Sequence, residues 1–153
     1  MVYYLNIGSN LGVREVCVAE AARAVEMAVG AVARCSVPME SEPWGYESEN
    51  AFLNMGMAVE CDIAPVDMLA ITQGIERDMG SAVHRDADGG YCDRSVDIDI
   101  IAVDDVVMEC EVLTIPHPRM HLREFVLKPM MELAPDWIHP ILHKTPSQLL
   151  AEL

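Results

Sequence analysis

Arg94-Ser95-Val96-Asp97-Ile98-Asp99-Ile100-Ile101-Ala102-Val103 sets two carboxylates into an apolar, β-branched run. Side chains alternate along a strand, so we predict one face made by Val96, Ile98, Ile100 and Ala102, and an opposite face made by Asp97, Asp99, Ile101 and Val103. The two carboxylates would point the same way, and their mutual repulsion favours a positive partner between them. Hard oxygen ligands at this spacing suit Mg²⁺. A merely hydrated face is the alternative, which we favour less because Asp is depleted in strands.

The composition predicts one cytoplasmic domain spanning residues 1–153. Hydrophobic residues make up 52% of the chain, but charged residues interrupt every apolar run before it reaches the length of a membrane span. The first residues lack the basic region and cleavage site of a secretory signal, so we expect no membrane partner. Five scattered cysteines without C-x-x-C spacing predict reduced thiols rather than a disulfide framework or a zinc site.

The charge balance excludes a nucleic-acid surface. With 25 acidic and 10 basic residues the net charge is −15, whereas phosphate backbones need a basic footprint. If the substrate is itself anionic, metal ions and a few arginines must overcome this repulsive field, so the arginines should cluster at the site.

Hydrophobic periodicity predicts a mixed sheet with helices packed on it. We expect strands over residues 2–7, 31–37 and 52–61, and helices over residues 14–29 and 64–80, ended by Gly30 and Gly80. A short helical piece carries Arg123 and Phe125, and Pro129 begins another helix that runs to residues 134–135. Residues 8–12 follow a strand but lack a Walker lysine and the Rossmann glycine spacing, so we interpret them as a turn.

Two further pairs of residues leave alternatives open. Phe52 and Asn54 share a strand face beside a glycine, which suits a flat heterocycle, although an amide bonded to backbone at the edge of the core is the simpler interpretation. Gln73 and Glu76 lie near the margin of a helix stripe that we expect to be buried through Met68, Ile71, Ile75 and Met79. They could reach a ligand or could form a hydrated boundary.

Seven motifs, taken in order, resemble those of the 6-hydroxymethyl-7,8-dihydropterin pyrophosphokinase family over nearly the whole chain. Any one alone would be weak, but their order and approximate spacing make a chance match improbable. They are Tyr4-Leu5-Asn6-Ile7-Gly8-Ser9-Asn10-Leu11-Gly12, Ser41-Glu42-Pro43-Trp44-Gly45, Phe52-Leu53-Asn54, Gln73-Gly74-Ile75-Glu76, Asp93-Arg94-Ser95-Val96-Asp97-Ile98-Asp99-Ile100, Leu113-Thr114-Ile115-Pro116-His117-Pro118 and Arg123-Glu124-Phe125-Val126-Leu127.

The resemblance implies an α+β fold, a ferredoxin-like α/β sandwich with a mixed, mostly antiparallel sheet and helices packed on it. It also implies transfer of pyrophosphate from ATP to 6-hydroxymethyl-7,8-dihydropterin, giving the pterin diphosphate and AMP, in folate biosynthesis. ATP would be the co-substrate and two Mg²⁺ ions the cofactors. The partners are then small molecules, and we expect a monomer.

The same resemblance implies roles for particular residues. Asp97 and Asp99 would hold the metal ions, with Asp97 also near the pterin. The pterin ring would lie between Phe52 and Phe125, with its edge read by Asn54 and by groups around Ser41 and Trp44. The positions that correspond to nucleotide contacts are Gln73, Glu76, Arg94, Ile100, Thr114, His117 and Arg123. Arg94 would steady phosphates with its planar fork of donors. His117 would donate a hydrogen bond to a phosphate rather than act as a general base.

The loop after Gly80 departs from the family pattern. Ser81, Val83 and Tyr91 occupy the approximate places of two arginines and a tryptophan, and the loop is longer. Either Arg85 takes the role of a missing arginine or loop closure depends more on Arg94; we count both among the candidate catalytic residues, with Asp97 and Asp99. We predict that Arg85→Ala lowers turnover and leaves ATP binding nearly intact, and unchanged turnover would remove Arg85 from the mechanism.

Two other classes of function fit parts of this pattern. A binding or regulatory module would keep the pterin pocket without chemistry, but it would not need two metal ligands. A different Mg²⁺-dependent nucleotidyl or phosphoryl transferase would not need the pocket that Phe52, Asn54 and Phe125 form for a second flat ligand.

Overall fold

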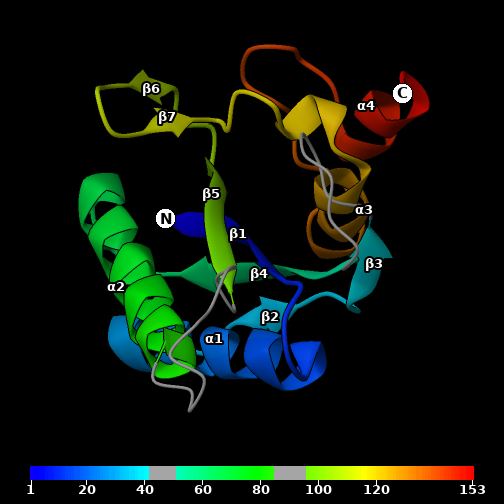
Figure 1. Ribbon diagram of the computed structural model, residues 1–153. Coiled ribbons are helices and arrows are strands. Elements are labelled where there is room, and N and C mark those ends of the chain that lie inside the picture. Colours follow the sequence, from blue (N-terminus) through cyan, green and yellow to red (C-terminus); the bar gives the residue numbers. More distant parts are fainter. Residues whose placement is uncertain (42–50, 85–95) are drawn as a thin grey trace.

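Strand β1 (Val2–Ser9) lies in the middle of the sheet around which the chain is arranged (Figure 1). The computed structural model describes residues 1–41, 51–84 and 96–153. On one side β1 pairs with β4 (Phe52–Glu60), and on the other with β5 (Asp97–Val103). Two short strands, β2 (Arg34–Cys35) and β3 (Met39–Ser41), both pair with β4. All pairings between the described strands are antiparallel.

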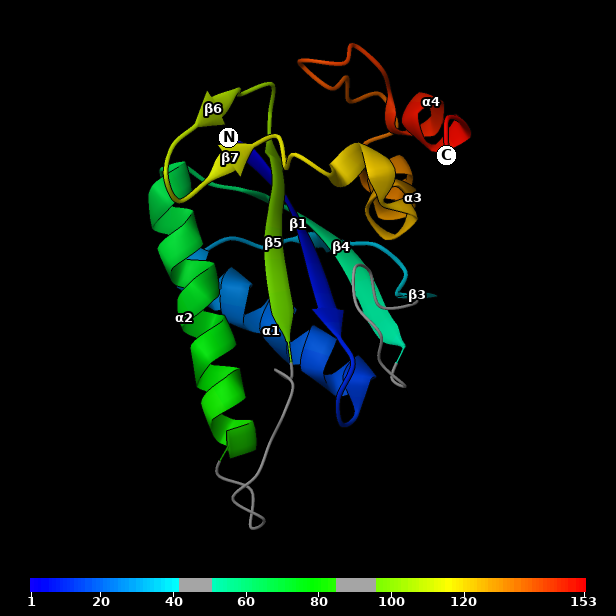
Figure 2. The ribbon, with the colours of Figure 1, turned by 45° about the horizontal axis from the view of Figure 1, so that its top comes forward.

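Helices cover both faces of this sheet, as Figure 2 shows. Helices α1 (Arg14–Val29) and α2 (Pro65–His84) pack on one face, and α3 (Glu124–Leu133) packs on the other with α4 (Pro146–Ala151) and a 3₁₀ turn at Met120–Leu122. A small hairpin, β6 (Met108–Glu109) with β7 (Thr114–Ile115), follows β5. Connections β1–α1–β2 and β4–α2–β5 each skip one strand, which is the split β-α-β arrangement of a ferredoxin-like sandwich. The predicted fold class is confirmed.

A β-bulge in β5 changes the predicted faces of its last residues. Leu5 of β1 pairs with Ile100, but Tyr4 pairs with Ala102, so Ile101 is an extra residue in the ladder. The alternation is therefore interrupted after Ile100. Val103 joins the core under α1 and α2, while Ala102 joins the core under α3, the reverse of the prediction. The prediction for Asp97 and Asp99 is unaffected because both precede the bulge.

Several helix and strand boundaries differ from the predicted ones. Strand β1 continues through Gly8 and Ser9, which were predicted to belong to a turn, because both residues pair with β4. Helix α2 continues past Gly80 to residue 84, because a glycine inside a helix costs only about 1 kcal/mol and does not by itself end it. Helix α3 is continuous through Pro129 instead of beginning there. The strand predicted over residues 31–37 shortens to β2. Helix α1 has the predicted bounds, and Gly30 ends it in the left-handed conformation with φ of 70°.

The buried stripe of α2 also differs from the predicted one. Met68 and Thr72 are fully buried and Glu76 is 7% exposed, whereas Ile71 and Ile75 are only partly covered. Glu76 therefore belongs to the interior rather than to the margin. The four cysteines that the structure describes are free thiols. Among the described residues, no helix is long and apolar enough to cross a membrane.

Candidate active site

Two rows of paired residues cross the sheet at one end and place the predicted site residues together. In the first row, Gly8 of β1 pairs with Asn54 of β4 on one side and with Asp97 of β5 on the other. In the second row, Asn6 lies between Gly56 and Asp99. Side chains two apart share a face, so Asp97 and Asp99 are neighbours on one face of β5, as predicted.

Gly8 has no side chain between the amide and the carboxylate of the first row, which lets side chains of β4 lie close to β1. A Cβ atom on residue 8 would lie 3.1 Å from Asn54 Oδ1 and 3.4 Å from Phe52 Cδ1. Phe52 and Asn54 therefore border the same space, which agrees with the predicted shared face. Gly8 was predicted only as the start of a turn, although a glycine within a strand is also a sign of close approach by another group.

The Asn54 amide is held by a side chain rather than by backbone. Its Nδ2 donates to Ser41 Oγ at 2.6 Å, and Asn54 is buried, with 3% of its surface exposed. The simpler interpretation, an amide bonded to backbone, is thus wrong. Because Ser41 belongs to β3 and Asn54 to β4, the strand pairing itself brings these two predicted pterin residues together.

Arg14 is a residue of this region that sequence analysis missed. Its Nη1 donates to the carbonyl oxygen of Ala51 at 2.9 Å, and its Nη2 pairs with the Glu40 carboxylate. Arg14 thus joins the start of α1 to β3 and to the residue that precedes Phe52. No helical or strand periodicity marks such a residue, so the sequence carried no signal for it.

Arg123 and Phe125 approach β5 from the start of α3. Arg123 Nη1 lies 3.7 Å from Asp99 Oδ2, and the guanidinium carbon lies 5.6 Å from the centre of the Phe125 ring. Burial lowers the pKa of Arg123 and the Asp99 carboxylate raises it, but a guanidinium remains a cation at neutral pH. A fixed positive charge therefore stands beside one of the two aspartates and against the face of an aromatic ring.

His117 is a neutral imidazole at physiological pH. Burial, followed by the charges of Arg123 and Arg119, lowers the pKa of His117 to about 4, although Asp97 acts in the opposite direction. Its Nδ1 accepts the backbone N–H of Arg119 at 3.1 Å, so the ring proton is assigned to Nε2. His117 is held against β5, since its own backbone N–H donates to the carbonyl of the bulged Ile101 at 2.8 Å. It can donate one hydrogen bond to a ligand.

A cavity of about 290 Å³ opens beside these residues, between β5 and the β6–β7 hairpin. The residues of its wall that were predicted to contact metal or nucleotide are Asp99, Ile100, Thr114 and His117. Leu69 and Leu113 add apolar surface. Three of the predicted nucleotide residues thus share one cavity with one of the two aspartates.

Glu76 supports the strand that carries the aspartates. Its Oε2 accepts the backbone N–H of Ile98 at 2.8 Å, on the side of β5 away from β1. β5 is at the edge of the sheet, and Ile98 lies between Asp97 and Asp99. The Glu76 carboxylate therefore bonds an outward-facing backbone N–H of this edge strand between the two aspartates. Gln73, by contrast, is exposed on α2 and does not line the cavity.

Three predicted site residues lie outside the described ranges. These are Trp44, Arg85 and Arg94. Their roles stay predictions.

The two aspartates fit a Mg²⁺ site of the kind that forms with a phosphorylated ligand. Both are only half-buried, and Asp99 lines the cavity. Within the described residues no group of three or more His, Cys, Asp and Glu could hold a metal. Mg²⁺ commonly uses one or two carboxylates and completes its shell with water and substrate phosphates, whereas zinc needs three or four protein ligands.

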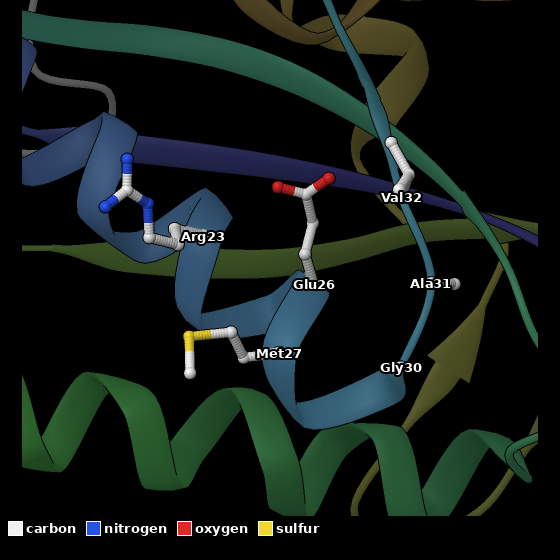
Figure 3. Close-up of a pocket in the computed structure, with 6 residues that line it drawn as sticks. All are labelled: Arg23, Glu26, Met27, Gly30, Ala31 and Val32. Atoms are coloured by element: carbon white, nitrogen blue, oxygen red, sulfur yellow. The ribbon is translucent and has the colours of Figure 1, made fainter.

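A second cavity, of about 340 Å³, lies at the end of α1 and is shown in Figure 3. Arg23, Glu26 and Met27 extend from the helix, and Gly30, Ala31 and Val32 follow it. Glu26 Oε2 already accepts the backbone N–H of Ala33 at 2.7 Å. No predicted site residue lines this cavity.

Known proteins resemble the chain along nearly its whole length. Residues 4–135 match the model of the 7,8-dihydro-6-hydroxymethylpterin-pyrophosphokinase family. The 2-amino-4-hydroxy-6-hydroxymethyldihydropteridine pyrophosphokinase of Porphyromonas gingivalis is 41% identical over 141 residues, covering 91% of this chain and 94% of its own. Folic acid synthesis protein fol1 of Schizosaccharomyces pombe is 35% identical over 153 residues, 99% of this chain but 20% of its own length.

Solved structures share the fold at lower sequence identity. An HPPK-DHPS chain in complex with substrates superimposes with a TM-score of 0.72 at 13% identity, and the match covers 99% of this chain. The chain corresponds to 43% of that longer chain. This likeness supports the architecture alone.

Proposed function

The chain belongs to the 7,8-dihydro-6-hydroxymethylpterin-pyrophosphokinase family and performs the pyrophosphokinase step of folate biosynthesis, and we propose that the two residue rows across β4, β1 and β5 are where it does so. In this reaction the hydroxymethyl oxygen of the pterin forms a bond to the β-phosphorus of ATP. The bond from that phosphorus to the oxygen bridging to the α-phosphorus breaks, AMP leaves, and the hydroxyl proton is released. No protein nucleophile is required, so positioning and charge neutralisation carry the rate.

Asp97 and Asp99 are the residues that would hold Mg²⁺. When bound, Mg²⁺ would supply charge neutralisation at the ATP phosphates; two ions are proposed. The two carboxylates lie on one face of β5, and Glu76 keeps the strand in place through Ile98. Arg123 adds a fixed positive charge 3.7 Å from Asp99. In a chain of net charge −15, this local grouping gives an anionic substrate a favourable place to bind.

The pterin would lie over Gly8, between Phe52 and Phe125. Phe52 and Asn54 lie close to Gly8 from β4, and the Asn54 amide is preoriented by Ser41. The amide offers a donor and an acceptor to the edge of the ring. Asp97, opposite Asn54 across Gly8, would then stand near the hydroxymethyl group. Trp44 is proposed to contribute from the same side.

ATP would occupy the cavity between β5 and the β6–β7 hairpin. Ile100 and Thr114 line it, and His117 would donate from Nε2 to a phosphate. With a pKa of about 4 this imidazole is an unsuitable proton acceptor at pH 7. Gln73, Arg94 and Arg123 are proposed as further contacts, and Arg85 or Arg94 as the cation over the transferred phosphates.

The observation that supports this proposal is the row Asn54, Gly8 and Asp97, in which the Asn54 amide and the Asp97 carboxylate lie on either side of a residue with no side chain. The test is to incubate the protein with ATP, Mg²⁺ and 6-hydroxymethyl-7,8-dihydropterin and to separate the nucleotides. AMP should appear in equal amount to the pterin diphosphate, and only with the metal. ADP would indicate an ordinary kinase, and tight pterin binding without AMP would indicate a binding module.

We also propose that the chain acts in the cytoplasm as a single-domain monomer without nucleic-acid or membrane partners. We expect a monomer because a site built from one chain requires no second copy. Analytical ultracentrifugation at micromolar concentration tests this through the sedimenting mass.

A further inference from the structure

We propose that Asn6 is a positioning residue for the pterin: it fixes the first turn of α3 on the sheet and thereby sets the position of the Phe125 ring. The inference rests on the proposed role of Phe125 as one side of the pterin pocket. Asn6 lies in the interior of strand β1, and its amide does not take part in the chemical step.

The observation is a hydrogen bond between the middle of the sheet and the backbone of α3. Asn6 Nδ2 donates to the carbonyl oxygen of Phe125 at 3.0 Å, across 119 residues of sequence. Asn6 itself is buried, with 5% of its surface exposed, and Phe125 is half-buried. A buried polar side chain in the central strand would be costly without such a partner.

Pro129 explains why the Phe125 carbonyl is available. In a regular helix that oxygen accepts the N–H of the residue four positions later, which here is Pro129. Proline has no N–H, and its ring crowds the carbonyl four residues earlier. Asn6 supplies the donor that the helix lacks. The helix thus continues through a residue that would ordinarily break it, with its freed carbonyl tied to β1.

Gly56 lets the same part of α3 approach the sheet. A Cβ atom on residue 56 would lie 2.6 Å from Pro129 Cβ and 3.1 Å from Leu133 Cδ1, so only glycine permits this contact. Gly56 pairs directly with Asn6, and Asn6 pairs with Asp99. Pro129 therefore packs against Gly56, and the Phe125 carbonyl is bonded to Asn6, the residue next to Gly56 in the second row.

The arrangement couples the two halves of the proposed site. Asp99 is held by β5, which pairs with Asn6, and Phe125 is held by the Asn6 amide. Arg123 also links the two groups, because its guanidinium lies near both Asp99 and the Phe125 ring. The distance between the metal carboxylates and the stacking ring is set through Asn6, and this distance must match the separation of the pterin ring from its hydroxymethyl oxygen.

The test is a double-mutant cycle of Asn6→Ala and Pro129→Ala, read by the pterin Kd, the ATP Kd and kcat. Asn6→Ala leaves the Phe125 carbonyl unpaired, and we expect the pterin Kd to rise about tenfold while the ATP Kd stays within about twofold. Pro129→Ala keeps the Cβ contact with Gly56 and restores the helical N–H. In that background, Asn6→Ala should raise the pterin Kd by about twofold or less.

A matched control is Tyr3→Phe, which removes another side-chain bond from β1 to a backbone carbonyl, that of Ile63, on the opposite face of the sheet. It should lower the Tm but leave the pterin Kd unchanged. An unchanged pterin Kd in Asn6→Ala, or the same penalty in both backgrounds, overturns the inference. If Asn6→Ala alone does not fold, the double variant decides: near-normal pterin affinity supports the role, and weak affinity contradicts it.

Phe125→Ala separates this inference from the proposed function. If that variant binds pterin normally, the proposed pocket itself is wrong. If it loses affinity while Asn6→Ala does not, only the role of Asn6 is wrong.

Discussion

Two cavities lined by described residues differ in chemistry more than in size. The larger one, about 340 Å³ at the end of α1, presents exposed Met27 and Val32 and one carboxylate that is already bonded to backbone. The smaller one, about 290 Å³ beside β5, brings together a half-exposed aspartate of β5 with a threonine and a neutral histidine donor from the segment that contains β7. Volume therefore does not identify the site; the convergence of unlike polar groups does.

Loss of either aspartate should produce the largest effect. Asp97→Ala or Asp99→Ala is expected to reduce kcat by about a thousandfold or more, because each removes a ligand that orients Mg²⁺ on the phosphates. Removing one of two repelling carboxylates should leave the Asp97 variant nearly as stable, whereas Asp99→Ala also removes the ion pair with Arg123 and should lower the Tm slightly. Steady-state assays of AMP formation and thermal melts measure both. Asp62→Ala, an exposed acid away from the site, is the control and should retain full activity.

Adding a side chain at Gly8 should affect the pterin and not ATP. Gly8→Ala puts a methyl group 3.1 Å from Asn54 Oδ1, and an overpacking cost of about 1.4 kcal/mol corresponds to about tenfold weaker pterin binding. Fluorescence titration with pterin and calorimetry with ATP separate the two affinities. Gly74→Ala adds a methyl group where only one side-chain atom lies within 4 Å, so its pterin affinity should stay normal. Equal loss in the two variants would argue against a pocket at Gly8.

The neutral state of His117 should be visible in stability as a function of pH. Its pKa is about 4 in the folded chain and about 6.5 when unfolded, so the unfolded state binds the extra proton first. The stability associated with this imidazole is present above pH 6.5 and is lost as the pH falls toward 4. Chemical unfolding of the wild type and of His117→Asn should therefore give a free-energy difference that shrinks from pH 7 to pH 4. A difference that grows on acidification would mean that the folded chain prefers the imidazolium.

The smallest effect is expected at the larger cavity. Met27→Ser replaces a side chain that is 78% exposed and should leave kcat and both substrate affinities unchanged. A loss of turnover comparable to that of Gly8→Ala would break the contrast between the two cavities and give the end of α1 a role in the reaction.

Sequence periodicity predicted the parts of the site that depend on one element. The alternation around Asp97 and Asp99, the shared face of Phe52 and Asn54, and the bounds of α1 all follow from local spacing. The ordered motifs then indicated the family. These features need no knowledge of how the elements pack.

Features that depend on pairing between distant segments were not predictable. The bulge at Ile101 arises from the register between β1 and β5, so it reversed the faces of Ala102 and Val103. Pro129 was predicted to begin a helix because proline is tolerated in the first turn and not in the interior. The helix nevertheless continues through it, since Asn6, more than a hundred residues away in sequence, supplies the missing donor. Glu76 was predicted at the margin of the buried stripe of α2, because local spacing does not reveal that its carboxylate accepts a backbone N–H of β5. In each case a tertiary contact overrode a sound local rule.

The most direct measurement is a crystal structure with a nonhydrolysable ATP analogue, Mg²⁺ and 6-hydroxymethyl-7,8-dihydropterin. We expect metal between the phosphates and the carboxylates of Asp97 and Asp99, with the pterin ring over Gly8 between Phe52 and Phe125. Metal bound away from both aspartates, or either substrate in the cavity at the end of α1, would contradict it.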